Sequence, residues 1–191
     1  MDLEIVPLTV ERFDDLAALF SEGGDPKWCW CAYWRLRSKD WSASSPTKNK
    51  AMLRSLASRS VPPGLLAYEG ERAVGWVGVA PREAFDRLEH SRVRPRLDDV
   101  PVWSIVCFVV SKAVRGRGVA GRLLDAAIEH ARAAGAPALE AYPVDPAAER
   151  VADNMAYTGA LSTFLAAGFR EVRSVDSPTA TVRRVIVRKE L

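Results

Sequence analysis

The apolar and polar positions of the chain follow two periods, about 2 in some segments and about 3.6 in others, which are typical of strands and helices. Alternating or continuous apolar runs predict strands at residues 3–8, 65–68, 73–80, 102–110, 138–144, 169–175 and 182–187. Apolar stripes at helical spacing predict helices at residues 13–20, 46–59, 82–89, 119–134 and 157–167. This order of elements predicts an α/β fold built on a mixed sheet.

The length and composition of the chain indicate one globular domain. Its 191 residues are 48% apolar and 27% charged, which is usual for folded proteins and excludes a disordered chain. We therefore expect a single domain over residues 1–191. Residues 25–45 form an aromatic insert within it, because four of the six tryptophans fall there.

Charge and cysteine content indicate which partners and which cellular compartment the protein has. The net charge of +3 is too weak to indicate nucleic acid as the main partner. Three cysteines do not make a disulfide framework, and the acidic start of the chain is unlike a secretion signal. No apolar run approaches the ~20 residues that span a membrane. We expect a cytoplasmic protein with no membrane partner and, because Cys29 and Cys31 have no second pair nearby, no metal site.

A glycine-rich junction carries the clearest chemical signal. The predicted strand 102–110 ends just before Gly116, Gly118 and Gly121, which open an amphipathic helix. Backbone N–H groups at such a helix start, with Arg115 and Arg117 beside them, suit a pyrophosphate. The junction lacks the Lys-Ser/Thr of a P-loop. Its glycines also fit the spacing of a dinucleotide-binding turn, but it lies in mid-chain after a hairpin, which disfavours that alternative.

Two motifs together resemble the GNAT acetyltransferases. Arg115-x-x-Gly118-x-Ala120 after an apolar strand resembles the family's acetyl-CoA signature, and residues 164–169, Phe-Leu-Ala-Ala-Gly-Phe, are similar to its late helix and turn. The resemblance covers most of the chain. It implies a mostly antiparallel sheet that splays at its central strands, has helices on both faces and admits acetyl-CoA, the acyl donor, into the gap. The implied cofactor-binding residues are Phe108, Val109 and Val110 for the pantetheine arm, and Arg115, Gly116, Arg117, Gly118, Val119 and Ala120 for the pyrophosphate.

The sequence departs from the family where protons are usually moved. The strand before the signature contains no Asp or Glu to act as a base, and Phe164 stands where many members have a tyrosine acid. The remaining catalytic candidates are Glu140 and Tyr142, which share one face of the strand beside the gap, and Ser162 in the late helix. Glu140 would act as a base or hold a water, and Ser162 would donate to the leaving thiolate. The alternatives are a surface or hydrogen-bonding carboxylate for Glu140, packing within the strand for Tyr142 and a hydroxyl bonded to its own helix backbone for Ser162. Cys107 is interpreted as a packing residue.

The aromatic insert is the candidate acceptor site, since the resemblance implies that this region walls it. The predicted substrate-binding residues Trp28, Trp30, Tyr33 and Trp34 would suit a flat, partly apolar amine or a cationic one. A satellite core cluster is the alternative. Residues 81–101 hold five arginines and His90, which could contact an anionic substrate or the 3′-phosphate of CoA, although interspersed acidic residues favour a solvated loop.

We therefore expect an acetyl-CoA-dependent N-acetyltransferase that acts on a primary amine by direct transfer in a ternary complex. An enclosed aromatic pocket favours a small-molecule acceptor over a protein tail. Two other functions stay open: a CoA-binding module without catalysis, and a basic RNA- or ribosome-binding protein. The oligomeric state, including a homodimer, also stays open.

Overall fold

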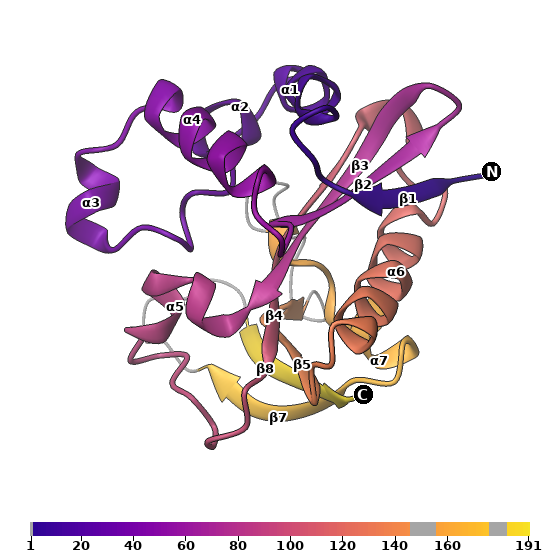
Figure 1. Ribbon diagram of the computed structural model, residues 1–191. Helices are drawn as coiled ribbons and strands as arrows, with labels where there is room; N and C mark the ends of the chain where they lie inside the picture. The colour runs from indigo at the N-terminus through magenta and orange to yellow at the C-terminus, as the bar shows by residue number, and fades with distance from the viewer. Residues whose placement is uncertain (1, 146–155, 176–182) are drawn as a thin grey trace.

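The computed structural model describes residues 2–145, 156–175 and 183–191, and these residues form one sheet of eight strands (Figure 1). Strands β1 to β5 follow one another in the order β1-β2-β3-β4-β5. β5 and β6 both pair with β8, and β7 also pairs with β8. The strand bounds are β1 Glu4–Pro7, β2 Gly64–Glu69, β3 Arg72–Pro81, β4 Trp103–Val110, β5 Ala138–Ala141, β6 Val144–Asp145, β7 Arg170–Val175 and β8 Arg183–Glu190.

The sheet opens between its central strands. β4 and β5 are the parallel neighbours, and they pair only where Trp103–Ile105 lie beside Leu139–Ala141. The other strand pairs of the sheet are antiparallel. Past Ile105 no described strand pairs with β4 on that edge, so its carboxyl-terminal half is paired with β3 alone. The expected mixed, mostly antiparallel sheet, open at its central strands, is confirmed.

Helices cover both faces of the sheet, as expected. In Figure 1, α6 and α7 lie on one side of β3 and β4, and α1 to α5 lie on the other. Each side has its own cluster of buried apolar side chains. The bounds are α1 Phe13–Ser21, α2 Pro26–Cys29, α3 Ser38–Ser42, α4 Pro46–Ala57, α5 Asp86–Glu89, α6 Val119–Ala133 and α7 Leu161–Ala166, with single 3-10 turns η1 Arg82–Ala84, η2 Lys112–Val114 and η3 Ala156–Thr158.

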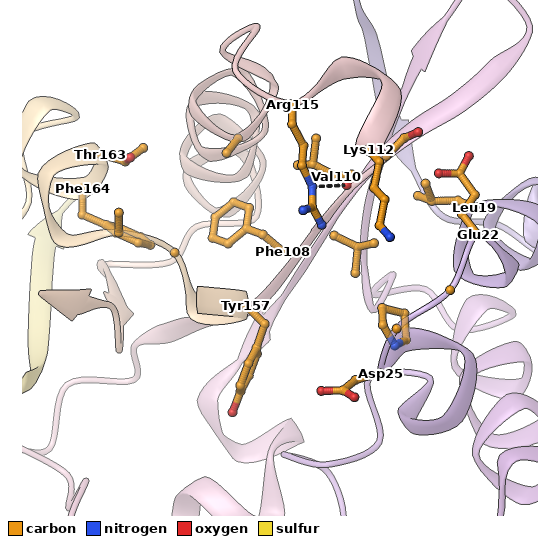
Figure 2. A pocket seen from close by; sticks show the side chains of 18 residues that line it. Leu19, Glu22, Asp25, Phe108, Val110, Lys112, Arg115, Tyr157, Thr163 and Phe164 are labelled. Atoms are coloured by element: carbon orange, nitrogen blue, oxygen red, sulfur yellow. Dashed lines mark hydrogen bonds between the residues drawn. The ribbon is translucent and has the colours of Figure 1, made fainter. Parts of the chain in front are cut away.

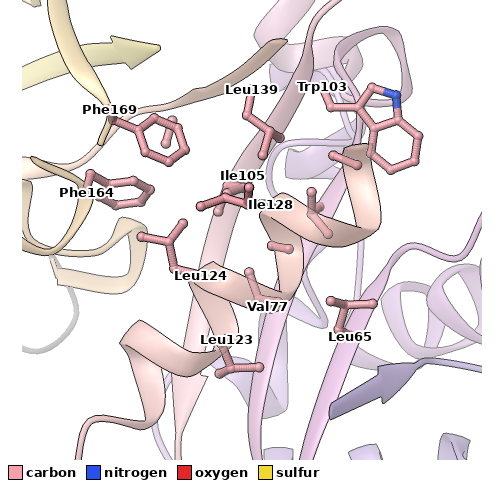
Figure 3. Packing of buried hydrophobic residues seen from close by; sticks show 14 of the residues in the cluster. Leu65, Val77, Trp103, Ile105, Leu123, Leu124, Ile128, Leu139, Phe164 and Phe169 are labelled. Carbon is pink, nitrogen blue, oxygen red and sulfur yellow. The ribbon is translucent and has the colours of Figure 1, made fainter. Parts of the chain in front are cut away.

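The alternation of side chains along β3 builds both cores. Val77 and Val79 pack in the cluster under α6, whereas Trp76 and Ala80 pack in the cluster under α1. Figure 3 shows the α6 side, where apolar residues of the helix face Val77 and the central strands. A Cβ on Gly75 would lie 2.9 Å from the Leu123 side chain, so glycine there lets α6 approach the sheet closely.

The structure differs from the predicted elements in four places. The helix predicted at 82–89 is divided at Phe85 into η1 and α5. The helix predicted at 157–167 is interrupted at Gly159, whose φ of +88° separates η3 from α7. The strand predicted at 138–144 is divided into β5 and β6 by Tyr142 and Pro143, and proline has no N–H for a ladder. The aromatic insert contains two short helices, α2 and α3, that the apolar pattern did not predict. Among the described residues, no helix combines the length and the apolar character needed to cross a membrane.

Candidate active site

A cavity of about 510 Å³ opens where β4 loses its second neighbour. One wall is the carboxyl-terminal end of β4, and η3 and α7 form the facing wall. The loop between α1 and α2 closes a third side (Figure 2). The lining residues come from four segments: Leu19 with residues 22–26, residues 108–112, Arg115 with Ala120, and residues 157, 159, 160, 163 and 164.

The glycine-rich turn leads from this cavity into α6. Gly116 and Gly118 have φ values of +75° and +79°, a region that disfavours residues with a Cβ. Gly118 is the residue before the first turn of α6, which contains no acidic residue. A Cβ on Gly118 would meet no atom within 4 Å, so the space beside the turn is open. The first N–H groups of this 15-residue helix have no partner within it and are suited to an anion.

The residues predicted to bind the cofactor divide into two groups. Phe108, Val109, Val110, Arg115 and Ala120 line the cavity, whereas Gly116, Arg117, Gly118 and Val119 do not. Arg117 forms an ion pair with Glu69 of the β2–β3 hairpin at 3.1 Å. The Val119 side chain is buried in the core under α6.

Glu140 and Tyr142 lie in a buried polar network away from the cavity lining. Arg82, whose side chain is fully buried, donates from Nη1 to Tyr142 Oη at 2.7 Å and to Glu140 Oε2 at 3.2 Å. The Ser104 hydroxyl lies 3.0 Å from Tyr142 Oη. Burial raises the pKa of Glu140 above its ordinary value, although Arg82 and Arg188 oppose the rise. The shared strand face was predicted correctly, but both side chains are engaged by Arg82.

Arg82 also binds α5 and the segment that follows it. Its Nε donates to Glu89 Oε1 at 2.8 Å, and its Nη2 donates to the backbone carbonyls of Leu88 and Arg94 at 3.2 and 2.7 Å. All five N–H groups of the guanidinium point toward protein acceptors. The network therefore ties β5 to the segment between α5 and β4.

Ser162 lies outside the cavity. It is exposed on α7, and the structure gives its side chain no contact with the cavity. The next two residues, Thr163 and Phe164, do line the cavity. Phe164 is fully buried and packs against Phe108 and Phe169, with ring centroids 6.1 and 5.2 Å away.

The four aromatic residues of the insert are absent from the cavity lining. Trp30 is buried against two phenylalanines of α1, which fits the alternative interpretation of a core cluster. Trp28 is 41% exposed and packs edge-on against Trp41. Trp34 is buried, with Tyr33 at its edge and Tyr142 stacked at 6.3 Å. Of these four rings, Trp34 is therefore the one that reaches the Arg82 network, through its stacking on Tyr142.

Several cavity residues were not predicted from the sequence. Glu22 and Asp25 enter the lining from the α1–α2 loop, and Tyr157 enters it from η3 (Figure 2). Burial raises the pKa of Tyr157 to about 12, with Tyr33 and Cys107 adding to the rise, so its hydroxyl stays protonated at neutral pH. Partial burial disfavours the charged form of Glu22, but Ser111 and Arg72 hold its pKa below the ordinary value. One signal was available: with phenylalanine at 164, Tyr157 is the nearest phenol in the sequence.

Most arginines of the segment 81–101 are occupied within the protein. Arg96 forms an ion pair with Glu89 at 2.6 Å, and Arg87 donates to the carbonyls of Tyr33 and Leu36 at 2.7 and 3.0 Å. Together with buried Arg82, they make the segment part of the fold rather than a free basic surface. This arrangement disfavours the RNA-binding alternative.

Comparison with known proteins agrees with this geometry. The sequence model of the acetyltransferase (GNAT) family matches residues 30–157. An acetyltransferase described as histone acetyltransferase HPA2-related, from Corynebacterium glutamicum, superposes with a TM-score of 0.64 at 17% identity, covering 100% of this chain and 97% of that one. A ribosomal-protein-alanine N-acetyltransferase from Brucella melitensis gives 0.59 at 18%, covering 98% and 99%. A GNAT acetyltransferase from Streptococcus pneumoniae gives 0.58 at 17%, covering both chains fully. No curated protein matches the sequence.

Proposed function

Because this chain belongs to the GNAT acetyltransferase family and is therefore an acyltransferase that uses acetyl-CoA, we propose that it acetylates the primary amine of a small molecule by direct transfer. The observation that carries this proposal is the cavity itself. It joins the unpaired edge of β4 to the start of α6. It also contains the phenol of Tyr157 and the carboxylates of Glu22 and Asp25. Its volume is within the range of small-molecule sites.

The residues present fit acetyl-CoA. The edge of β4 past Ile105 offers backbone N–H and C=O groups that a pantetheine arm can pair with, as a strand would. The N–H groups at the start of α6 suit the diphosphate, and Arg115 adds a positive charge at the cavity wall. Ala120 lies on that wall with a side chain small enough to leave room.

Transfer requires the amine nitrogen to attack the thioester carbon. A C–N bond forms and the C–S bond breaks, the amine loses a proton, and CoA leaves as the thiolate. We assign to a β4 backbone N–H the polarisation of the thioester carbonyl. Asp25 is an exposed carboxylate on the cavity wall, and we assign it the attraction of the cationic amine.

Tyr157 is the proposed donor to the leaving sulfur. A phenol with a pKa of about 12 would transfer its proton uphill to a thiolate whose conjugate acid has a pKa of about 8.5. Its role is therefore a hydrogen bond that stabilises the thiolate, and the proton that the sulfur finally takes comes from the amine or from water. Glu140 and Tyr142 are assigned to positioning, because Arg82 engages both side chains.

Direct transfer is favoured over an acetyl-cysteine intermediate. Cys107 is buried, and the hydrogen bond with Cys31, together with burial, raises its pKa well above the ordinary value. The thiolate is the nucleophilic form of cysteine, so Cys107 is a poor acceptor of the acetyl group. The cytoplasmic location stays a prediction from cysteine content.

The experiment that tests the proposal is thermal unfolding with acetyl-CoA, CoA or NAD. Wild type is compared with Ala120→Trp, which fills the cavity wall, and with Arg122→Trp, an exposed position on the same helix. A ligand at a hundred times its Kd adds about 2.7 kcal/mol of stability. We expect both CoA species to stabilise wild type and the Arg122 variant, and neither to stabilise the Ala120 variant. No shift in wild type would refute the proposal.

A CoA-binding module without catalysis is the second candidate, favoured by Phe164 at the usual tyrosine position. Release of the CoA thiol from acetyl-CoA, measured with and without a panel of amines, separates the two functions. Amine-dependent release supports the enzyme. Binding of acetyl-CoA without amine-dependent release supports the module.

A further inference from the structure

Arg94 has a cationic side chain that finds no hydrogen-bond acceptor among the residues that the structure describes. Its guanidinium carbon lies 5.2 Å from the ring centroid of Trp34. Its Nε is buried and has no hydrogen-bond partner. Within the described part of the chain, its guanidinium forms no ion pair and no hydrogen bond. Leaving a buried N–H group unpaired costs free energy, so the Arg94 side chain has hydrogen-bonding capacity that a ligand can use.

The neighbouring acidic residues are occupied elsewhere. Glu89 accepts from both Arg82 and Arg96, at 2.8 and 2.6 Å. Arg188 binds Asp98, with one of the two contacts at 2.9 Å. These two carboxylates are therefore taken by other arginines, and no described carboxylate forms an ion pair with Arg94.

The side chains around Arg94 are aromatic or positively charged. Burial lowers the pKa of Arg94, and Arg184 lowers it further, whereas Tyr157, Tyr33 and Tyr142 act in the opposite direction. These groups are thus its electrostatic neighbours. Tyr157 lines the cavity and packs against the same buried cluster as Trp34, so the stacked pair of Trp34 and Arg94 is placed on the Tyr157 side of the cavity.

The backbone carbonyl and the backbone N–H of Arg94 are both hydrogen-bonded. Its carbonyl accepts from Arg82 Nη2 at 2.7 Å, and its N–H donates to Ser91 Oγ at 3.1 Å. Stacking on Trp34 restrains the guanidinium. A fixed guanidinium loses little conformational entropy when it binds a ligand.

We propose that Arg94 binds a carboxylate of the acceptor, so that the substrate is an amine that carries a carboxylate in the same molecule. The planar fork of arginine matches a carboxylate with two parallel hydrogen bonds. The amine end would lie toward Asp25 and the edge of β4, and the carboxylate end toward Trp34 and Arg94. This inference rests on the proposed acetyltransferase function and adds the substrate class to it.

The test uses matched pairs of amines: L-amino acids and their amides, in which a neutral amide replaces the carboxylate. Wild type is compared with Arg94→Gln, Arg94→Lys and Arg92→Gln. Arg92 is an exposed arginine of the same loop, so its variant controls for the loss of charge. We expect wild type and the Arg92 variant to prefer the acid by at least tenfold in kcat/KM. Arg94→Gln should lose that preference, and Arg94→Lys should keep part of it.

A binding measurement that needs no turnover accompanies this assay. Thermal unfolding of the CoA-bound protein is followed with benzoate and with benzamide. Benzoate should stabilise wild type and the Arg92 variant but not Arg94→Gln, and benzamide should stabilise none of them.

The outcomes separate this inference from the proposed function. Acids and amides acetylated equally well, or a preference that survives Arg94→Gln, would overturn the carboxylate assignment and leave the acetyltransferase intact. If acetyl-CoA binds but no amine of the panel reacts, the benzoate experiment decides. In that case the absence of an Arg94-dependent shift in melting temperature overturns the carboxylate assignment. Failure of wild type to bind acetyl-CoA removes the proposed function itself.

Discussion

The guanidinium of Arg82 donates a 2.7 Å hydrogen bond to the backbone carbonyl of Arg94, twelve residues away in the sequence. The same side chain donates to Glu140 and Tyr142 on the other side. Residues that the sequence indicated as proton-transfer candidates are thus connected, through one buried arginine, to the loop that carries Arg94. The connection predicts effects on both stability and substrate choice.

Replacing Arg82 with methionine should be strongly destabilising. It leaves the buried Glu140 carboxylate with the Tyr142 hydroxyl at 3.3 Å and, among the described residues, Arg188 as its remaining cationic neighbour at 3.7 Å. Removing one partner of a buried ion pair costs about 3–5 kcal/mol. Urea denaturation measures the loss, with Arg96→Met as the control, because Arg96 is partly exposed in its ion pair and should cost less than about 1 kcal/mol. Equal losses in the two variants would contradict the buried network.

Replacing Phe164 with alanine should create a cavity in the core under α7. The ring is fully buried between Phe108 and Phe169, so we expect a loss of about 3–5 kcal/mol. Leu165→Ala is the matched control, since Leu165 is 47% exposed and should change stability by less than about 0.5 kcal/mol. Denaturant titration of both variants checks the difference, and a small effect at Phe164 would show that the site is not packed as described.

Replacing Tyr157 with phenylalanine should slow transfer without weakening acetyl-CoA binding. Loss of a donor to developing negative charge should lower kcat by about tenfold to a hundredfold. Tyr68→Phe is the control, because its hydroxyl donates to Asp15 and lies outside the cavity lining. Since the pKa of Tyr157 is about 12, wild-type kcat should not fall as pH rises through 10, the ordinary tyrosine value. An unchanged kcat in the Tyr157 variant would exclude the donor role.

Replacing Asp25 with asparagine should raise KM for the amine about fivefold, since an exposed ion pair contributes up to about 1 kcal/mol. The carboxylate is on the cavity wall, whereas Asp40 of α3 is not and provides the control variant Asp40→Asn. Steady-state kinetics at low and high salt measures the effect, which should shrink as salt screens the attraction. The assignment fails if the two variants behave alike.

Asp98 should contribute to acid sensitivity. The hydrogen bond from Arg188 is the main cause that lowers its pKa from 3.8 to about 2. The folded state therefore binds this proton more weakly than the unfolded state, so the stabilisation is present above pH 4 and is lost as pH falls toward 2. Melting temperatures between pH 5 and 3 should fall less steeply in Asp98→Asn than in wild type. Asp99→Asn, at a neighbour with no ion pair among the described residues, should match wild type; parallel curves for all three proteins would contradict the prediction.

The sequence by itself predicted most of the sheet, the longer helices and the glycine-rich turn before α6. Periodicity along β3 and α6 is local, and a glycine-rich turn before a helix fixes its own geometry through the φ values of Gly116 and Gly118. Phe108, Val109 and Val110 line the cavity, and the sequence could indicate them because the open edge of a strand depends on position more than on side chain.

Only the tertiary structure decided which side chains meet across the fold. Glu140 and Tyr142 share a strand face, as alternation predicts, but Arg82, 58 and 60 residues away in the sequence, engages both. Asp25 and Tyr157 reach one cavity from segments more than a hundred residues apart, and no spacing rule connects them. Arg94 and Arg96 are the same residue type two positions apart, and they differ in what surrounds them. Arg96 forms an ion pair with Glu89, whereas Arg94 stacks on Trp34. Local backbone conformation depends on residues that are neighbours in the sequence, whereas burial and charge compensation depend on contacts between residues that are far apart in it.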